Sequence, residues 1–198
     1  MTISAFFSEG GETLLAHVAA FASEEIVLDM RIPRQQQTNW CWAAVAVGIK
    51  DAYLDHPPEQ CALATSTFGQ ECCPIGINPS CDAPHALEKP LGDNFVSVSD
   101  APSVRTPDFI RRNIKQNGRP IAVRLGATNG GAGHFVAIVG YRSIGSRFFV
   151  HIDDPHFGPS EHAIEEFFDN HQQTFSWDRS YRTKGGTRPR VPRKGAVQ

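Results

Sequence analysis

One stretch of the chain, from Trp42 to His56, has apolar residues at helical spacing. Most residues of this stretch are good helix formers, and its apolar positions lie three or four residues apart at Val45, Ile49, Ala52 and Tyr53. The pattern ends at the adjacent prolines Pro57 and Pro58. The sequence therefore predicts a helix that starts at or just before Trp42.

The second half of the chain has the pattern of a sheet. Apolar or alternating runs predict strands over residues 121–125, 134–141, 148–154 and 174–182, and a glycine-rich loop lies ahead of the second one. A helix is expected to begin at Thr106, a capping residue followed by proline and aspartate, and another over 160–168. Helices in the first half of the chain and an antiparallel sheet in the second half predict an α+β fold.

The rest of the first half is less regular. We expect a short helix over residues 12–22, a strand over 26–32 that ends at Pro33, loops with one or two helical turns over 57–84, and a short helix over 85–91. The predicted domains are an unassigned segment at 1–25, one catalytic domain at 26–181 and a basic tail at 182–198. The tail has six basic residues and no acids, so we expect it to be disordered.

Composition narrows the class of protein. A chain of 198 residues, 40% of them hydrophobic, can bury one sizeable core, and a formal net charge of −2 gives no reason to expect nucleic acid or a membrane as partner. No run of residues is long enough to span a bilayer. The first residues lack the basic start of a secretory signal, so export would need another route.

Four of the five cysteines lie close together, at Cys61, Cys72, Cys73 and Cys81. We favour two disulfides, with Cys72 and Cys73 bonded to different partners. Reduced structural thiols and a zinc site that includes His85 are the competing interpretations. The zinc site is the weakest because the paired C-x2-C spacing is missing, and we expect no metal and no cofactor.

The fifth cysteine, Cys41, is the candidate nucleophile. At a helix N-terminus, the free N–H groups and the helix dipole favour the thiolate, which is the reactive form. Gln35, six residues earlier, could donate an N–H to an oxyanion beside that sulfur. An isolated cysteine in an apolar run is otherwise best explained as a small buried hydrophobe.

A thiolate needs an imidazole partner, and that imidazole needs an acceptor on its other nitrogen. Of the eight histidines, His134 opens a strand after the glycine-rich loop, whereas the other seven are expected at the surface or partly buried. If the next hairpin turns through residues 143–145, His134 lies directly opposite Asp154, with β-carbons about 4.5–5.5 Å apart. A slip of one residue would favour Asp153.

These motifs, Q-x5-C-W-A-A, then Gly-His-Phe-Val at 133–136 and Asp-Pro at 154–155, resemble the papain-like cysteine peptidases. The resemblance is closest to bacterial effector proteases and leader-trimming peptidases. It implies a helical lobe packed on an antiparallel sheet lobe, and a cysteine protease with Cys41, His134, Asp154 and Gln35 as site residues. A Gly-Ser-type pair precedes the cysteine in plant and lysosomal enzymes, whereas this chain has Asn39-Trp40.

Taken together, these features predict a secreted effector or toxin that acts on proteins and is restrained by a cognate inhibitor. Delivery into another cell without a signal peptide would agree with the first residues of the chain. The same fold and residue order also serve deamidases, transglutaminases and peptide:N-glycanases, which all use an acyl-enzyme. A housekeeping leader peptidase and, from a different class, a non-catalytic binding module are two further hypotheses.

Overall fold

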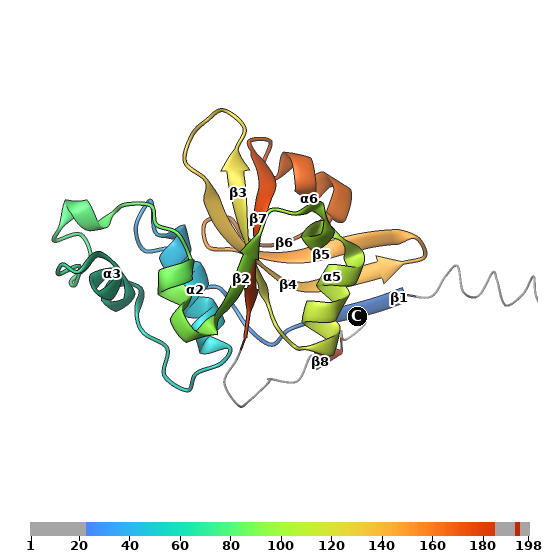
Figure 1. Cartoon of the computed structure of the whole chain (residues 1–198), viewed down its shortest axis with the longest axis horizontal. Helices are drawn as coiled ribbons and strands as arrows, with labels where there is room; N and C mark the ends of the chain where they lie inside the picture. Colours follow the sequence, from blue (N-terminus) through green and yellow to red (C-terminus); the bar gives the residue numbers. More distant parts are fainter. Residues whose placement is uncertain (1–22, 185–192, 195–198) are drawn as a thin grey trace, which may run out of the picture.

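The computed structural model describes residues 23–184 and 193–194. The helices of residues 41–91 gather on one side of the molecule, and a twisted antiparallel sheet with the two remaining helices forms the rest (Figure 1), which confirms the α+β prediction. The expected helix at 12–22 lies outside the described residues, as does most of the 1–25 segment and of the tail. In the described part of the chain, no helix is long and apolar enough to cross a bilayer.

The sheet has eight strands in the order β2-β7-β3-β4-β1-β8, with β5 added to β4 and β6 to β5. Their bounds are Ser23–Val27 (β1), Phe95–Ser99 (β2), Ile121–Ala127 (β3), His134–Ile144 (β4), Arg147–Asp154 (β5), Gly158–Ala163 (β6), Phe175–Thr183 (β7) and Arg193–Lys194 (β8). Strand β4 pairs with β1, β3 and β5. Its first eight residues are buried, which explains its almost continuous apolar sequence.

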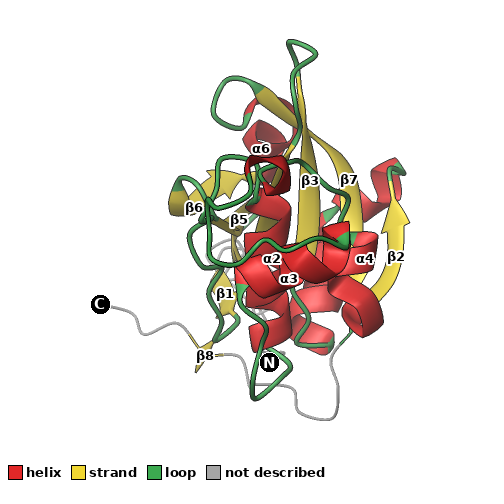
Figure 2. Cartoon of the chain, turned by 90° about the vertical axis from the view of Figure 1, so that its left-hand side faces the viewer, coloured by secondary structure: helices red, strands yellow, loops and turns green. Residues whose placement is uncertain are grey.

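The helices are α2 (Cys41–Asp51), α3 (Gln60–Phe68), α4 (Glu88–Leu91), α5 (Pro107–Arg111), which continues as a π-helix over Arg112–Gln116, and α6 (Ile164–Asn170). Short 3-10 turns lie at Pro79–Cys81, Gly92–Asn94 and Pro102–Arg105. Thr106 caps α5 as predicted, since its hydroxyl accepts the N–H of Phe109. Helices α2, α3 and α4 lie together in front of the strands in Figure 2.

Helix α2 is the central helix of the core. The side chains of Trp42, Val45 and Ile49 are fully buried, and so are the three alanines at positions 43, 44 and 46. A helix that is apolar on most sides is typical of one enclosed by the rest of the protein. Burial of α2 fixes the position of its first residue, Cys41.

Two disulfides close the lobe that contains α3. Cys61 is bonded to Cys73, and Cys72 to Cys81, while Cys41 is free. This confirms that the four clustered cysteines form disulfides and that the adjacent pair bonds to different partners. The nine-residue helix α3, about two and a half turns long, lies in the segment where loops with one or two helical turns were expected.

Several boundaries in the sheet half differ from the prediction. The expected helix at 160–168 is divided between the end of β6 and helix α6. Strand β6 was not predicted because its sequence, GPSEHA, has no apolar run. Strand β2 was also missed. At the C-terminal side β7 continues to Thr183, and Arg193–Lys194 pairs with β1, so part of the predicted disordered tail belongs to the sheet.

Candidate active site

Cys41 is the first residue of α2, and the residue before it, Trp40, is the N-cap. Trp40 has no side-chain oxygen to accept the free N–H groups of the first turn, and no side chain caps this helix end. Those N–H groups therefore remain available beside the Cys41 sulfur. The sulfur sits where the positive end of the helix dipole stabilises a thiolate and a developing oxyanion.

The residues on either side of Cys41 are hydrogen-bonded to the segment that begins at Cys81. Asn39 donates its backbone N–H to Asp82 Oδ1 over 2.7 Å and its side-chain N–H to the Asp82 carbonyl over 3.0 Å. The indole N–H of Trp40 binds the Cys81 carbonyl at 2.6 Å, and that of Trp42 binds the Ala83 carbonyl at 3.0 Å. The disulfide lobe thus holds both flanks of Cys41.

His134 is the first residue of β4 and pairs with Leu125 of β3. Its Nε2 lies 2.9 Å from Asp154 Oδ1, and its second ring nitrogen, Nδ1, is left for an interaction with Cys41, which is close enough to raise the pKa of the ring. Burial disfavours the charged imidazolium, but the hydrogen bond to Asp154, the hydrogen bond to Cys41 and the nearby negative charges raise the pKa of His134 to about 9. The imidazolium form is therefore available at neutral pH.

Asp154, the last residue of β5, is fully enclosed and accepts several hydrogen bonds. Oδ1 also accepts the backbone N–H groups of His156 at 2.7 Å and Phe157 at 3.1 Å. Burial favours the neutral acid, but the bonds from His134, from His171 and from this turn hold the pKa of Asp154 well below its usual range. Asp154 is therefore a carboxylate at neutral pH.

The structure brings Cys41, His134 and Asp154 together, but not through the predicted register. The β4–β5 hairpin closes at Ile144↔Arg147 around a two-residue turn, with Gly145 at φ 57°, and a bulge lies between Ile138 and Gly140. The strand partner of Asp154 is Gly158 of β6. The turn residue Gly145 was identified correctly, whereas the loop length and the bulge were not, so the direct His134–Asp154 pairing was wrong.

Asp153 has a different role. It pairs with Ala137, and its Oδ2 accepts the backbone N–H of Ile32 over 2.8 Å. This bond joins the segment ahead of α2 to the end of β5. Asp153 is therefore a structural residue, and Asp154 is the carboxylate that faces His134.

A second histidine, His171, lies behind Asp154. Its side chain is fully buried, and its Nε2 is 3.3 Å from Asp154 Oδ2. Its Nδ1 is buried without a partner among the described residues, so Nε2 is the ring nitrogen that donates to Asp154. The prediction that all histidines except His134 are at the surface or only partly buried was wrong here.

Gln35 lies in the loop before α2, with its side-chain N–H groups turned to that loop. Nε2 donates to the carbonyls of Gln37 at 3.0 Å and Thr38 at 2.7 Å, while Oε1 is buried without a partner among the described residues. The amide thus shapes the approach to Cys41. Its role as an oxyanion donor stays a prediction, because these bonds would have to be exchanged first.

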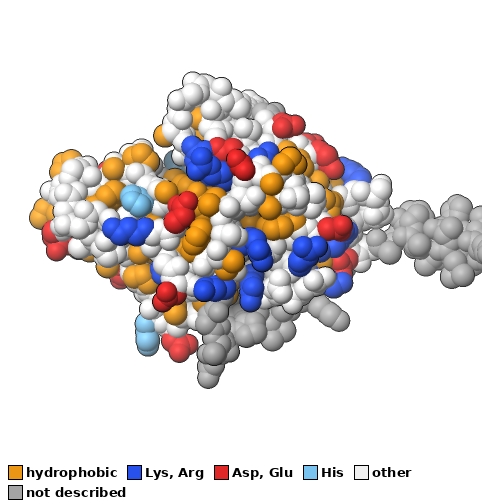
Figure 3. Space-filling view, in the orientation of Figure 1, with side chains coloured by type: hydrophobic (Ala, Val, Ile, Leu, Met, Phe, Trp, Pro, Cys, Tyr) orange, Lys and Arg blue, Asp and Glu red, His pale blue; other side chains and the backbone are white. Residues whose placement is uncertain are grey.

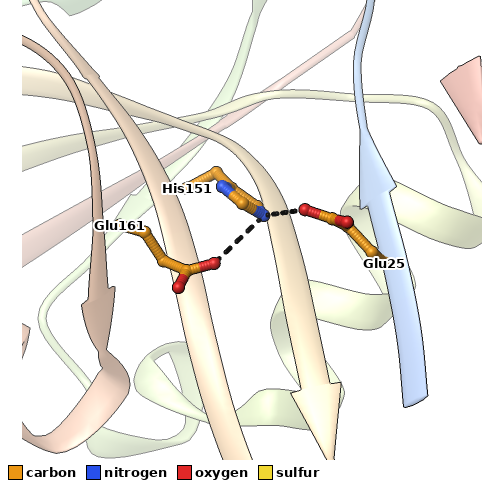
Figure 4. A group of neighbouring side chains, drawn as sticks. All are labelled: Glu25, His151 and Glu161. Carbon is orange, nitrogen blue, oxygen red and sulfur yellow. Dashed lines mark ion pairs between the residues drawn. The ribbon is translucent and has the colours of Figure 1, made fainter. Parts of the chain in front are cut away.

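Another cluster of titratable side chains lies on β1, β5 and β6. Figure 4 shows His151 between Glu25 and Glu161, with Nε2 at 3.0 Å from the first carboxylate and 3.6 Å from the second. Three ligand atoms this close could hold a cation. However, both oxygens of Glu161 accept bonds from the Arg142 guanidinium, which supplies the positive charge, so the contacts describe an ion-pair network across three strands.

Comparison with known proteins agrees with this arrangement. No curated protein sequence matches the chain. A sequence-family model described as the Peptidase_C39 like family matches residues 27–184, from the end of β1 to the residue after β7. This match includes Cys41, His134 and Asp154 and supports a cysteine peptidase of papain-like fold. The chain belongs to the Peptidase_C39 like family.

Proposed function

We propose that this protein is an endopeptidase that cleaves protein substrates through a thioester formed on Cys41. The observation that carries the proposal is the His134 ring, which is hydrogen-bonded to the buried Asp154 carboxylate and lies close enough to Cys41 for that residue to raise its pKa. Cys41 lies at the N-terminus of α2, and His134 and Asp154 come from the start of β4 and the end of β5. A thiol, a base and an orienting acid in this order match the requirements of nucleophilic catalysis.

The first half of the reaction forms the acyl-enzyme. The Cys41 thiolate attacks the scissile carbonyl carbon, and the negative charge that develops on the oxygen is stabilised by free N–H groups at the start of α2. The His134 imidazolium then gives its proton to the leaving amine as the carbon–nitrogen bond breaks. A thioester on Cys41 and a new N-terminus result.

The second half regenerates the enzyme. His134, now neutral, takes a proton from water, and the hydroxide attacks the thioester carbonyl. The carbon–sulfur bond breaks, the carboxylic acid product leaves and the thiolate–imidazolium pair is restored. Asp154 keeps the ring oriented and its charge favours the imidazolium in both halves.

We further propose that the enzyme acts outside the cell that makes it, as an effector or toxin with a cognate inhibitor. The two disulfides beside Cys41 support this proposal, because disulfides persist mainly in oxidising compartments. Expression of the wild-type chain in a naive host should be toxic, and Cys41→Ala should not be. Equal growth of both strains, with no cleaved host protein, would favour a housekeeping processing peptidase instead.

Mapping of new N-termini tests the peptidase proposal. A cell lysate is incubated with the wild-type protein or with Cys41→Ala, and peptides with new N-termini are identified by mass spectrometry. We expect new termini only with the wild type. A mass gain of about one unit on glutamine, without new termini, would indicate deamidation and contradict the proposal.

A further inference from the structure

A cavity of about 360 Å³ lies between the helical lobe and the sheet, and its lining includes Gly133 and Phe135, the two chain neighbours of His134. One wall is the segment 84–86, which follows the disulfide lobe, and the other is formed by β3, β7 and the glycine-rich loop. Phe135 and Tyr181 contribute apolar surface, and Arg124 and Arg179 contribute positive charge. The cavity is large enough for one side chain of a bound peptide.

The two arginines occupy an unusual position in the sheet. Arg124 of β3 and Arg179 of β7 are direct partners in the ladder. Like charges placed directly opposite each other destabilise a sheet. Asp178 forms an ion pair with Arg124, whereas no carboxylate of the described residues forms an ion pair with Arg179. The residues that line the cavity thus include two arginines and no carboxylate.

Two glycines make room for the Arg124–Asp178 ion pair. A methyl group on Gly133 would lie 3.0 Å from both Nε and Nη2 of Arg124 and 2.9 Å from the Leu125 carbonyl oxygen. A methyl group on Gly126 would lie 2.7 Å from Asp178 Oδ2. The missing side chain at Gly133 thus leaves space for the Arg124 guanidinium. Gly133 directly precedes His134 in the chain. Larger residues at either position would displace the charged pair.

This position places the charge close to the reaction. Gly133 lines the cavity, and the next residue is the imidazole partner of Cys41. An extended peptide advances about 3.3 Å per residue, and the cavity lining adjoins His134 in the chain, so we assign the cavity to a substrate side chain within two residues of the cleaved bond. In Figure 3, a small patch of Lys and Arg side chains, with Asp or Glu side chains beside it, lies below the β3–β4 loop.

We propose that Arg124 and Arg179 form a subsite that selects an acidic side chain, Glu or Asp, within two residues of the cleaved bond. This inference deepens the proposed peptidase function and rests on it. A carboxylate in the cavity would accept charge-assisted hydrogen bonds from the guanidinium groups and relieve their mutual repulsion. Phe135 and Tyr181 would pack against the methylene groups of the side chain.

The test uses a library of peptides from a digested proteome, exposed to the full-length enzyme, with cleavage sites mapped by mass spectrometry. We expect Glu and Asp to be enriched over Gln and Asn at one position within two residues of the cleaved bond. In a synthetic peptide pair that differs only in Glu or Gln there, kcat/KM should favour Glu by about tenfold, the scale of one charge-assisted bond.

Variants identify the residues responsible. Arg179→Gln should reduce the Glu-to-Gln ratio several-fold, and Arg179→Glu should abolish it. The double variant Arg124→Gln with Asp178→Asn removes the other guanidinium without leaving its carboxylate unpaired, and should also lower the ratio. Arg182→Gln, an exposed arginine on the same strand outside the cavity, is the matched control and should leave the ratio unchanged.

The outcomes separate this inference from the proposed function. Cleavage without a preference for acidic residues, or a preference that survives in Arg179→Glu, would overturn the subsite and leave the peptidase intact. A failure of the wild type to cleave any peptide would overturn both.

Discussion

The indole N–H of Trp40 donates to the carbonyl oxygen of Cys81 over 2.6 Å, which ties the residue before the candidate nucleophile to one end of a disulfide. Trp42 and Asn39 bind the next two residues of the same segment. The carbonyl of a disulfide-bonded residue has little freedom to move. The Cys72–Cys81 disulfide therefore supports the position of Cys41 as well as the stability of its own lobe.

The first prediction compares the two disulfides. They join residues 9 and 12 positions apart, so removing either should lower the free energy of unfolding by a similar amount, about 2–4 kcal/mol. Of the two disulfides, only Cys72–Cys81 includes the residue, Cys81, whose carbonyl accepts the indole N–H of Trp40. Replacing both of its cysteines by serine should lower kcat about tenfold more than the same change at Cys61 and Cys73. Peptidase assays and chemical denaturation measure the two effects.

In that experiment the Cys61/Cys73 variant is the matched control for loss of a crosslink. If both double variants lose activity equally at matched folded fraction, the Trp40–Cys81 bond has no special role.

The second prediction separates the two adjacent aspartates. Asp154→Ala should lower kcat on the order of a hundredfold or more, because His134 loses its orienting carboxylate. Asp153→Ala should lower the free energy of unfolding by about 1–3 kcal/mol, because the buried N–H of Ile32 loses its acceptor, with a smaller effect on kcat. Circular dichroism melts and kinetics distinguish them. A larger kcat loss in Asp153→Ala would reverse our assignment.

The third prediction concerns His171 as a positioning residue. His171→Leu should lower kcat about tenfold, because Asp154 loses one of its donors and can turn away from His134. His171→Gln retains an N–H near the position of Nε2 and should recover most of the loss. A merely structural role would give both variants the same kcat at matched folded fraction, and that result would contradict the prediction.

The fourth prediction is a pH dependence. The pKa of His134 is raised to about 9, so the imidazolium that protonates the leaving amine is lost only as the pH rises through that value. The alkaline limb of kcat/KM should lie near pH 9. In Asp154→Asn it should move to lower pH, because the hydrogen bond to the carboxylate raises the pKa. An unchanged alkaline limb in that variant would assign the limb to another group.

The sequence was sufficient to predict the parts of the site that depend on local patterns. Helix formers define α2, although it ends at Asp51 and not near Pro57, and apolar runs define β4 and β5. Cys41 could therefore be placed at a helix start and Asp154 at a strand end. The contact between His134 and Asp154 was anticipated, although through a register that the bulge and the short turn rule out.

The residues that could not be predicted depend on tertiary contacts. His171 is followed by two glutamines and carries no local sign of burial, yet the fold encloses it behind Asp154. Gln35 has the spacing from Cys41 expected of an oxyanion donor, but its side-chain amide is hydrogen-bonded to loop carbonyls. No sequence pattern predicts these hydrogen bonds. Strand β6 is polar and belongs to the sheet only because β5 offers it a partner.

The central claim is that Cys41 carries the acyl group, and a rapid-quench experiment tests it most directly. The enzyme is mixed with a peptide identified by N-terminus mapping, stopped with acid within one turnover, and digested for peptide mapping. We predict the N-terminal fragment of the substrate on Cys41 as a thioester that hydroxylamine removes, and no adduct in Cys41→Ala. Turnover in Cys41→Ala, or an adduct on any other residue of the wild type, would contradict the mechanism.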